Sequence, residues 1–395
     1  MANDPIFILA ARRTPMGAFQ GVLAPTTAPQ LGAAAIAAAL ATAGVDSADL
    51  DEVIMGCVLP AGLGQAPARQ AALGAGVPVG TPATTINKMC GSGMRAIMIG
   101  ADQIAAGSAN LVVAGGLESM SNAPYLLPKA RAGYRMGHQE VLDHMFYDGL
   151  QSPWDGKLMG VFAEATAGKY GFSRKAQDEF AAESVRRAQA AMAGGGFAAE
   201  ITPVAVRTRK GEVLIGEDET PHTLDISKIA SLKPAFKPDG TVTAASSSGI
   251  ADGAAAVVLS SAATVAARGL RPLARIVAHQ SFAREPEWFT LAPVGAINKV
   301  LNQAGWRTGD VDLFEINEAF AVVTMAAIKD LGLDHARVNV NGGACALGHP
   351  VGASGARIVA TLLHALQARG KRRGIASLCI GGGEATAIAV ELIQG

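Results

Sequence analysis

The chain resembles itself at a shift of about 261 residues, and this internal repeat constrains the fold more than any other feature (310 − 49 = 261). Each copy carries a glycine after an alanine-rich stretch, an acidic pair before an apolar run, and a Ser-Gly pair that opens a helical stretch. Three matches at nearly one spacing, in the same order, predict two halves with the same fold. The matched pairs are Gly44 with Gly305, Asp49 with Asp310, and Ser92 with Ser354.

Short apolar runs alternate with alanine-rich helical stretches along both halves. This alternation predicts an α/β fold, in which helices cover the faces of a sheet. The predicted strands are Ile6–Leu9, Val53–Met55, Leu111–Val113, Val257–Leu259, Arg275–Ala278, Leu313–Ile316 and Ser377–Ile380. The predicted helices are Gln30–Ala43, Gly93–Ala106, Arg174–Met192, Val294–Ala304 and Ala353–Ala368.

A segment between the two halves has no counterpart in the repeat. Residues 120–245 are irregular, rich in Gly, Pro, Met and charges, and contain one predicted helix, Arg174–Met192. We interpret this segment as an inserted loop domain that covers a site. The expected division is therefore 1–119 with 246–270 as the first half, 120–245 as the insertion, and 271–395 as the second half.

Composition excludes several classes of partner. Lys+Arg and Asp+Glu both number 33, so the formal net charge is zero and neither a nucleic-acid surface nor a membrane-binding basic face is expected. The apolar runs are of strand length or interrupted, so no transmembrane helix is expected. Four cysteines without a C-x-x-C pair predict reduced thiols and a cytoplasmic protein. Cys57 and Cys345 are assigned to core packing.

Cys90 lies in a glycine-rich string directly before a predicted helix. Backbone N–H groups and the helix dipole at such a position stabilise negative charge, which lowers the pKa of a thiol. Gly91 and Gly93 allow backbone N–H groups to approach a substrate carbonyl. The string predicts a nucleophile, and a small buried cysteine in a tight turn is an equally good interpretation of it.

His349 stands between Gly348 and Pro350, again ahead of a predicted helix. An imidazole held in this way can take the proton of a thiol and later donate to an oxyanion. A lone histidine is more often structural, but the glycines around this one indicate a close approach of backbone to another group. The string therefore favours a functional histidine.

Two further strings follow predicted strands. Cys379 is followed by Gly381, Gly382 and Gly383, so a second thiol there can serve as acid or base beside glycine N–H groups, although buried cysteines at strand ends are common. Asn317 stands between Glu315 and Glu318, too polar a group for packing alone, and its amide can position a water or cap a helix. No string has the spacing of a metal site, a P-loop or a dinucleotide fingerprint.

Together, the four strings resemble the thiolase family. They occur in the family's order, as Cys90-Gly91-Ser92-Gly93, Asn317-Glu318-Ala319-Phe320, Gly348-His349-Pro350 and Cys379-Ile380-Gly381-Gly382-Gly383, and the resemblance runs from Arg12 to the C-terminus. It implies two duplicated βαβαβαββ halves in a five-layer αβαβα core, with a loop domain inserted in the first half. It also implies coenzyme A as a substrate, with no permanently bound cofactor and no metal.

The resemblance implies a role for each residue of the strings. Cys90 takes the acyl group as a thioester, and His349 activates Cys90 and helps to polarise the bound thioester carbonyl. Cys379 removes a proton from the α-carbon of the second acyl-CoA. Asn317 holds a water that forms one oxyanion hole with His349, and the N–H groups of Cys90 and Gly381 form the other.

The resemblance further implies a binding path for acyl-CoA, with some departures from the family. Met159 borders the acyl pocket, and Phe289 stands where a methionine often lines it. Leu158 replaces a frequent histidine, Glu384 replaces a frequent methionine, and 220–222 lacks an arginine that often holds the nucleotide. The positions implied near the pantetheine are Ala244, Ser248, Ile250, Ala319 and Phe320.

The expected activity is reversible Claisen condensation of two acetyl-CoA to acetoacetyl-CoA and CoA. A broader 3-ketoacyl-CoA thiolase of fatty-acid degradation shares the same catalytic residues, so only pocket shape distinguishes the two. A non-catalytic protein of this fold that binds acyl-CoA or lipid is the alternative of another class, and the presence of Cys90, His349 and Cys379 argues against it. The resemblance implies a homotetramer or a homodimer.

Overall fold

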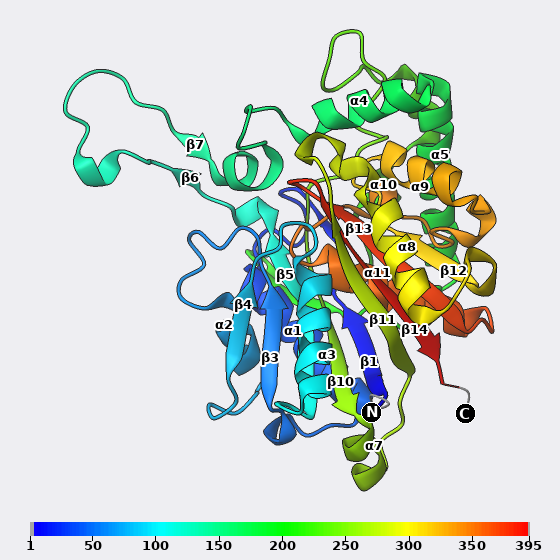
Figure 1. The fold of residues 1–395 in the computed structure, drawn as a ribbon. Coiled ribbons are helices and arrows are strands. Elements are labelled where there is room, and N and C mark those ends of the chain that lie inside the picture. The colour runs from blue at the N-terminus through cyan, green and yellow to red at the C-terminus, as the bar shows by residue number, and fades with distance from the viewer. Residues whose placement is uncertain (1–3, 394–395) are drawn as a thin grey trace.

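In the computed structural model, which describes residues 4–393, one ten-stranded sheet runs through both halves of the chain (Figure 1). Its order is β12-β13-β14-β11-β1-β10-β5-β3-β4, with β2 beside β10. The first half supplies β1 (Ile6–Arg13), β2 (Gly17–Ala18), β3 (Glu52–Gly56), β4 (Ala83–Ile86), β5 (Leu111–Ser119) and β10 (Ala251–Ser261). The second supplies β11 (Ala274–Ala283), β12 (Leu313–Ile316), β13 (Arg373–Ile380) and β14 (Glu384–Leu392).

The strand order repeats, which confirms the duplication predicted from the sequence. The order β3-β5-β10-β1 of the first half corresponds to β12-β13-β14-β11 of the second, and the halves join where Ile6–Ile8 of β1 pairs with β11. The counterpart of β4 in the second half is reduced to a single parallel bridge between Phe314 and Val338 at that edge of the sheet.

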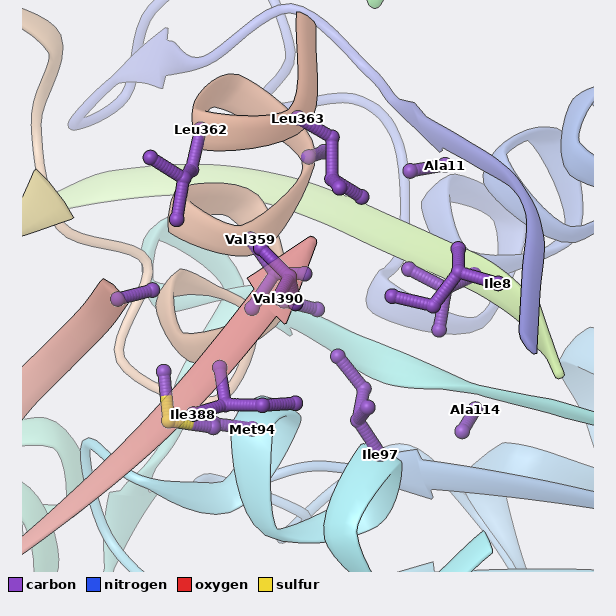
Figure 2. Close-up of a cluster of buried hydrophobic side chains, with 14 of the residues drawn as sticks. Ile8, Ala11, Met94, Ile97, Ala114, Val359, Leu362, Leu363, Ile388 and Val390 are labelled. Atoms are coloured by element: carbon purple, nitrogen blue, oxygen red, sulfur yellow. The ribbon is translucent and has the colours of Figure 1, made fainter. Parts of the chain in front are cut away.

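Five layers follow from where the helices pack. α3 (Ser92–Ala106) and α11 (Ser354–Ala368) lie between the two halves of the sheet, and the largest buried cluster holds side chains of both helices together with strands of both halves. Figure 2 shows part of this cluster, with Met94 and Ile97 of α3, Val359 of α11 and Ile388 of β14. α1 (Ala28–Ala43) and α2 (Pro67–Gly74) cover the outer face of the first half. α8 (Ala292–Ala304) and α9 (Ala321–Leu331) cover that of the second.

The two inner helices touch at their first turns. A Cβ added at Gly93 would lie 2.8 Å from the backbone nitrogen of Ala356, and one added at Gly355 would overlap the backbone of Met94. Only glycine permits this approach of one helix to the other. The contact matters for function because Cys90 and His349 lie just ahead of these two helices.

The matched glycines of the repeat serve as matched helix ends. Gly44 ends α1 at φ 64° and Gly305 ends α8 at φ 67°. Both angles are in the left-handed region, where glycine avoids the steric cost that a side chain brings. At the other end of α1, Thr27 and Gln30 form a capping box. The repeat in the sequence thus reflects glycines that end corresponding helices in the two halves.

Several strands are longer than the sequence predicted. The run predicted as Leu111–Val113 continues through Gly115 and Gly116 to Ser119. These glycines interrupt the apolar pattern, but neighbouring backbone leaves no room for a side chain at either position. A Cβ at Gly116 would overlap the carbonyl oxygen of Gly352, on the loop that carries His349. Close packing against that loop overrides the low strand propensity of glycine.

The segment between β5 and β10 contains more regular structure than the one helix predicted for it. α5 (Arg174–Ala193) is present as expected, and α4 (Met159–Tyr170) was missed because Gly160 and Gly168 weaken its helical pattern. The other elements include β6 (Tyr125–Leu126), β7 (Leu142–Asp143), a π-helix at Met145–Leu150, β8 (Val204–Thr208), β9 (Gly211–Ile215) and α6 (Thr220–Thr223). The predicted division at residues 119, 245 and 270 stays a prediction, and its first three and last two residues lie outside the described residues.

This segment is fastened to the sheet by a buried ion network. Arg13 of β1 contacts Glu200 at 2.5 Å and Asp218 at 2.7 Å, and all three side chains are fully buried. By contrast, β6 and β7 form the base of an arm that projects away from the body (Figure 1). Among residues 4–393, no helix is both long and apolar enough to cross a membrane. The short helices α7 (Ala262–Arg268) and α10 (Ala344–Leu347) complete the fold.

Candidate active site

A pocket of about 200 Å³ opens where the loops before α3 and α11 meet the end of β13 and the inserted segment. Cys90 comes from the first loop, His349 from the second, and Gly381 from the turn after β13. Three strings that are far apart in the sequence therefore share one cavity. The residues singled out from the sequence that line it are Cys90, Met159, Ser248, Ile250, Phe289, Ala319, Phe320, His349 and Gly381.

Cys90 lies half-buried, two residues before α3 begins. Met89 has a positive φ of 47°, which is uncommon for a residue with a side chain and indicates that the turn is held firmly. The N–H groups of Gly381 and of Cys90 lie in hydrogen-bonding range of the Cys90 sulfur and lower the pKa of its thiol. These are the two donors expected to form an oxyanion hole. A side chain at Gly91 would overlap Ile380, so the turn packs directly against the end of β13.

The expectation of a lowered pKa at Cys90 is nevertheless wrong. Burial raises the pKa of the thiol, and the charge of Glu118 raises it further, against the two N–H groups. Removal from water disfavours the thiolate more than the backbone donors favour it. The Cys90 thiol is therefore protonated near neutral pH and needs a base to become a nucleophile.

His349 is arranged to be that base. Burial, and secondarily the charge of Arg357, lowers its pKa to about 3, so the imidazole is neutral. Its Nδ1 lies 2.5 Å from Oγ of Ser354, and that hydroxyl also lies 2.9 Å from the carbonyl oxygen of Pro350. A carbonyl only accepts, so Ser354 donates to Pro350 and accepts from Nδ1–H. This assigns the lone pair to Nε2, which has no hydrogen-bond partner among the described residues.

Cys379 lies behind the pocket surface, at the end of β13. It is fully buried, and its pKa is raised well above the usual value by burial and then by the nearby Cys90. The interaction with Cys90 places the two sulfurs in one electrostatic environment. A thiol of high pKa is a weak acid, and its thiolate is a strong base, as proton exchange with a carbon acid requires. Gly382 and Gly383 follow with φ of 98° and 92°, which closes the turn before β14.

Asn317 is also buried behind the pocket and does not cap a helix. The residue that precedes α9 at the N-cap position is Phe320, and no side chain caps that end, so the capping interpretation is wrong. Arg357 approaches Oδ1 of Asn317 at 3.4 Å, and Nδ2 has no partner in the described part of the chain. Because Arg357 only donates, this contact fixes which end of the amide is the oxygen. The Nδ2 amide group is therefore the donor that remains available to hold a water.

The two carboxylates near Asn317, Glu315 and Glu318, are bound to buried protein groups and do not line the pocket. Glu315 pairs with Arg357 at 3.3 Å, and burial raises its pKa to about 8. Glu318 accepts hydrogen bonds from Ser184 and Asn339. Cys57 and Cys345, assigned to packing, are both buried.

Most residues expected near the pantetheine lie along one side of the pocket. The Ser248 N–H and hydroxyl both donate to the carbonyl of Ala319, at 3.0 and 3.1 Å, which joins the loop before β10 to the loop before α9. Ala244 is the exception, since it is exposed and does not line the pocket. Two departures also lie elsewhere: Glu384 pairs with Lys88, and 220–222 lies in α6.

Several lining residues were not anticipated from the sequence. Phe146, Gly149 and Leu150 come from the π-helix, and Phe236 from a loop, and no motif in the sequence marks them. Glu118, in β5, is a buried carboxylate that supports the site. Its carboxylate accepts the N–H groups of Val58, Leu59 and Gly352, so it ties the His349 loop to the chain after β3. Burial raises the pKa of Glu118 to about 7.

The donor set does not fit a metal. In the part of the chain that the structure describes, no three His, Cys, Asp or Glu side chains are grouped to hold an ion. The arrangement instead combines a thiol, a neutral imidazole, a second thiol and inward-facing N–H groups. Such a site can form a thioester, stabilise an oxyanion and exchange a proton at carbon.

Comparisons with known proteins agree with this chemistry. Residues 6–263 match the family model for the thiolase N-terminal domain, and residues 270–392 match that for the C-terminal domain. An acetyl-CoA acetyltransferase of Pseudomonas aeruginosa is 51% identical over 97% of this chain and 98% of its own length. That of Escherichia coli is 50% identical over 98% and 99%. The Acat5 thiolase of Ascaris suum, solved in complex with coenzyme A, superposes with a TM-score of 0.94 at 43% identity, over 98% of this chain and 100% of that one. The chain is a member of the thiolase family and an acyltransferase.

Proposed function

We propose that the protein catalyses the reversible Claisen condensation of two acetyl-CoA to acetoacetyl-CoA and CoA, through an acyl-enzyme on Cys90. The observation that carries the proposal is the meeting of Cys90, Gly381 and His349 in one mostly apolar pocket of about 200 Å³, with Cys379 directly behind. The relatives named acetyl-CoA acetyltransferase and the coenzyme A complex of the Ascaris suum thiolase support the choice of substrate.

In the first half-reaction, Nε2 of His349 takes the thiol proton as Cys90 attacks the carbonyl carbon of acetyl-CoA. The oxyanion is stabilised by the N–H groups of Cys90 and Gly381. Expulsion of the CoA sulfur, which takes the proton from His349, leaves an acetyl thioester on Cys90. The Nε2 lone pair of the neutral imidazole is free to accept that proton.

In the second half-reaction, Cys379 acts as the thiolate and removes a proton from the methyl carbon of a second acetyl-CoA. A water that accepts a hydrogen bond from Asn317 Nδ2 donates to the enolate oxygen, and Nε2 of His349, which gave its proton to CoA, accepts a hydrogen bond from the same water. The enolate carbon then attacks the acetyl thioester on Cys90, and the Cys90 sulfur leaves with the proton from Cys379. The two half-reactions use one pocket in turn, so the kinetics are ping-pong.

A broader 3-ketoacyl-CoA thiolase of fatty-acid degradation is the second candidate. Leu158 and Phe289 favour it, because both add apolar surface to the pocket wall. A non-catalytic acyl-CoA or lipid carrier is the alternative of another class. It is disfavoured because a carrier has no need of two thiols and an imidazole with a free nitrogen.

We further propose a cytoplasmic homotetramer, or a homodimer, acting in fatty-acid or acetyl-CoA metabolism. The arm is the candidate contact, defined here as residues 123–143 around β6 and β7. Its large apolar side chains are exposed and unsupported by the body, which is typical of surfaces that bind another protein. These side chains are Tyr125, Leu127, Tyr134, Met136 and Val141.

The test is CoA-dependent cleavage of acetoacetyl-CoA and of 3-oxooctanoyl-CoA by the parent and by Cys90→Ala. Cleavage of only the shorter substrate, lost in the variant, supports the acetyl-CoA proposal. Comparable cleavage of both favours the broader thiolase. Binding of acyl-CoA without any cleavage would leave only the carrier.

A further inference from the structure

The first turn of α11 carries two buried polar side chains that contact residues of the site. Ser354 begins the helix and Arg357 follows three residues later, so the two are neighbours on one face of the helix. Ser354 contacts the ring of His349, and Arg357 contacts the amide of Asn317. One helical turn therefore supports both of the side chains that would hold the water of the second half-reaction.

Arg357 reaches from α11 to the end of β12. One terminal nitrogen of its guanidinium lies 3.3 Å from Oε1 of Glu315, and the other lies 3.4 Å from Oδ1 of Asn317. Glu315 and Asn317 are two residues apart, and side chains at that spacing in an extended chain lie on the same side. A planar guanidinium, with donors on both terminal nitrogens, can contact the two oxygens at once.

These three side chains have little freedom to move. Arg357 is fully buried, and Glu315 and Asn317 are 2% and 1% exposed. The backbone of Asn317 is also fixed, because its N–H donates to the carbonyl oxygen of Ser377 at 3.0 Å. Arg357 does not line the catalytic pocket, so it can act on the reaction only through the residues that it contacts.

The contact with Arg357 determines the orientation of the Asn317 amide. A guanidinium only donates, so Oδ1 faces Arg357 and Nδ2 is directed away from it. Neither Nδ2 of Asn317 nor Nε2 of His349 has a hydrogen-bond partner among residues 4–393, although both atoms are buried. One of these atoms is a donor and the other an acceptor, which is a combination that a single water can satisfy.

The orientation of this amide affects only one of the two half-reactions. With Nδ2 toward the water, the water accepts from Asn317 and keeps both hydrogens, one for the enolate oxygen and one for His349. With the amide reversed, one hydrogen would bond to Oδ1, and only the other would remain. Acyl transfer uses the N–H groups of Cys90 and Gly381 instead, and it needs no water on Asn317.

We propose that Arg357 is a positioning residue of the second half-reaction, which keeps Nδ2 of Asn317 directed at the water that stabilises the enolate. The proposal rests on the proposed thiolase function and adds to it a residue that touches neither the substrate nor the reacting atoms. Loss of Arg357 should slow proton removal from the methyl carbon of acetyl-CoA and spare the transfer of the acetyl group.

Two reactions of acetyl-CoA in D2O, both followed by mass spectrometry, separate the half-reactions. In the first, the Cys379 thiolate takes a methyl proton, the thiol exchanges with solvent, and the enolate recovers a deuteron from it. In the second, Cys90 takes the acetyl group and CoA leaves, and the sulfur of dephospho-CoA then displaces Cys90 and carries the acetyl group away. The measured quantity is the ratio of the exchange rate to the transfer rate.

Arg357→Met should lower this ratio roughly tenfold, because the amide loses its fixed orientation. Glu315→Gln is the matched control, since it breaks the same ion pair, leaves the contact with Asn317 and should keep the ratio. The double variant Glu315→Gln with Arg357→Met leaves no carboxylate of this pair without its cation, and it should show the same tenfold loss. Asn317→Ala should lower the ratio at least as much, and adding Arg357→Met to it should lower the ratio no further.

The outcomes separate this inference from the function on which it rests. A parent that neither exchanges nor transfers overturns both. A parent that does both, with equal loss of the two reactions in folded Arg357→Met, makes Arg357 a structural residue and overturns the positioning role alone. A further fall in the ratio when Arg357→Met is added to Asn317→Ala also overturns it, because Arg357 would then act through another group. The same holds if Glu315→Gln lowers the ratio as far as Arg357→Met does.

Discussion

Ser354 holds the imidazole of His349 by a contact of 2.5 Å from Oγ to Nδ1, while the same hydroxyl donates to Pro350. Ser354→Ala removes the acceptor for Nδ1–H and frees the ring to rotate or change tautomer. Loss of one such hydrogen bond is worth about 1–3 kcal/mol, so kcat for acetoacetyl-CoA thiolysis should fall roughly 5- to 150-fold. Ser377→Ala is the matched control, since it removes a buried hydroxyl bonded to Thr386, outside the pocket. Equal effects of the two changes would contradict the orienting role.

His349 makes stability depend on pH in a defined direction. Its pKa is about 3 in the fold against 6.5 in the unfolded chain, so between these values the unfolded state binds more protons. Stability is therefore lost as the pH falls below 6.5. From pH 7.5 to 5.5 the parent should lose about 1.4 kcal/mol more than His349→Gln. Urea unfolding of both at the two pH values, at one protein concentration, measures the difference, and parallel losses would contradict it.

Gly116 supports the loop that carries His349. Gly116→Ala places a methyl group against the carbonyl oxygen of Gly352, and neither backbone can move away easily. We expect a loss of roughly 1–3 kcal/mol in stability, with activity reduced beyond the loss of folded protein. Gly168→Ala is the same change in α4 with nothing within 4 Å, and it should stabilise by roughly 0.5–1 kcal/mol. Thermal unfolding of both variants tests the opposite signs.

Arg13 neutralises two buried carboxylates of the inserted segment, Glu200 and Asp218. Arg13→Met leaves both without their cation, and breaking a buried network of this kind costs roughly 3–5 kcal/mol. Lys175→Met breaks an exposed pair with Glu179, 3.8 Å apart, and should cost under about 1 kcal/mol. Denaturant midpoints for the two variants give the comparison. A small effect at Arg13 would mean that the insertion is held by its apolar contacts.

The arm is expected to determine oligomeric state. Replacing residues 127–141 by a short Gly-Ser linker removes most of its exposed apolar surface, and light scattering should then report a smaller assembly. Thiolysis per active site should persist, since no lining residue of the pocket lies in that range. The control changes Val213 and Leu214 to threonine, which removes exposed apolar side chains on β9 instead. An unchanged mass after loss of the arm would contradict the assignment.

The sequence by itself determined the class of fold and most of the lining of the pocket. The repeated glycines and acidic pairs mark helix ends and strand starts, which are local decisions, so the duplication and the α/β alternation could be read directly. The strings around Cys90, His349 and Gly381 indicated a function only together, because each one alone also fits packing, whereas several such strings in one order are specific. α4, the shortening of the β4 counterpart to one bridge and the length of β5 could not be read from the sequence, because packing overrode local propensity at each of them.

Only the tertiary structure determined the pKa values of those residues and the shape of the pocket. The turn before α3 indicated a lowered pKa for Cys90, but burial outweighs the backbone donors and moves the pKa upward. The neutral state of His349 follows from burial and from Arg357, eight residues further along, whose effect depends on side-chain geometry. The catalytic pocket combines residues of the insertion with the loop before α11 and the turn after β13. Desolvation and cavities are properties of atoms brought together from distant parts of the chain, and no local pattern encodes them.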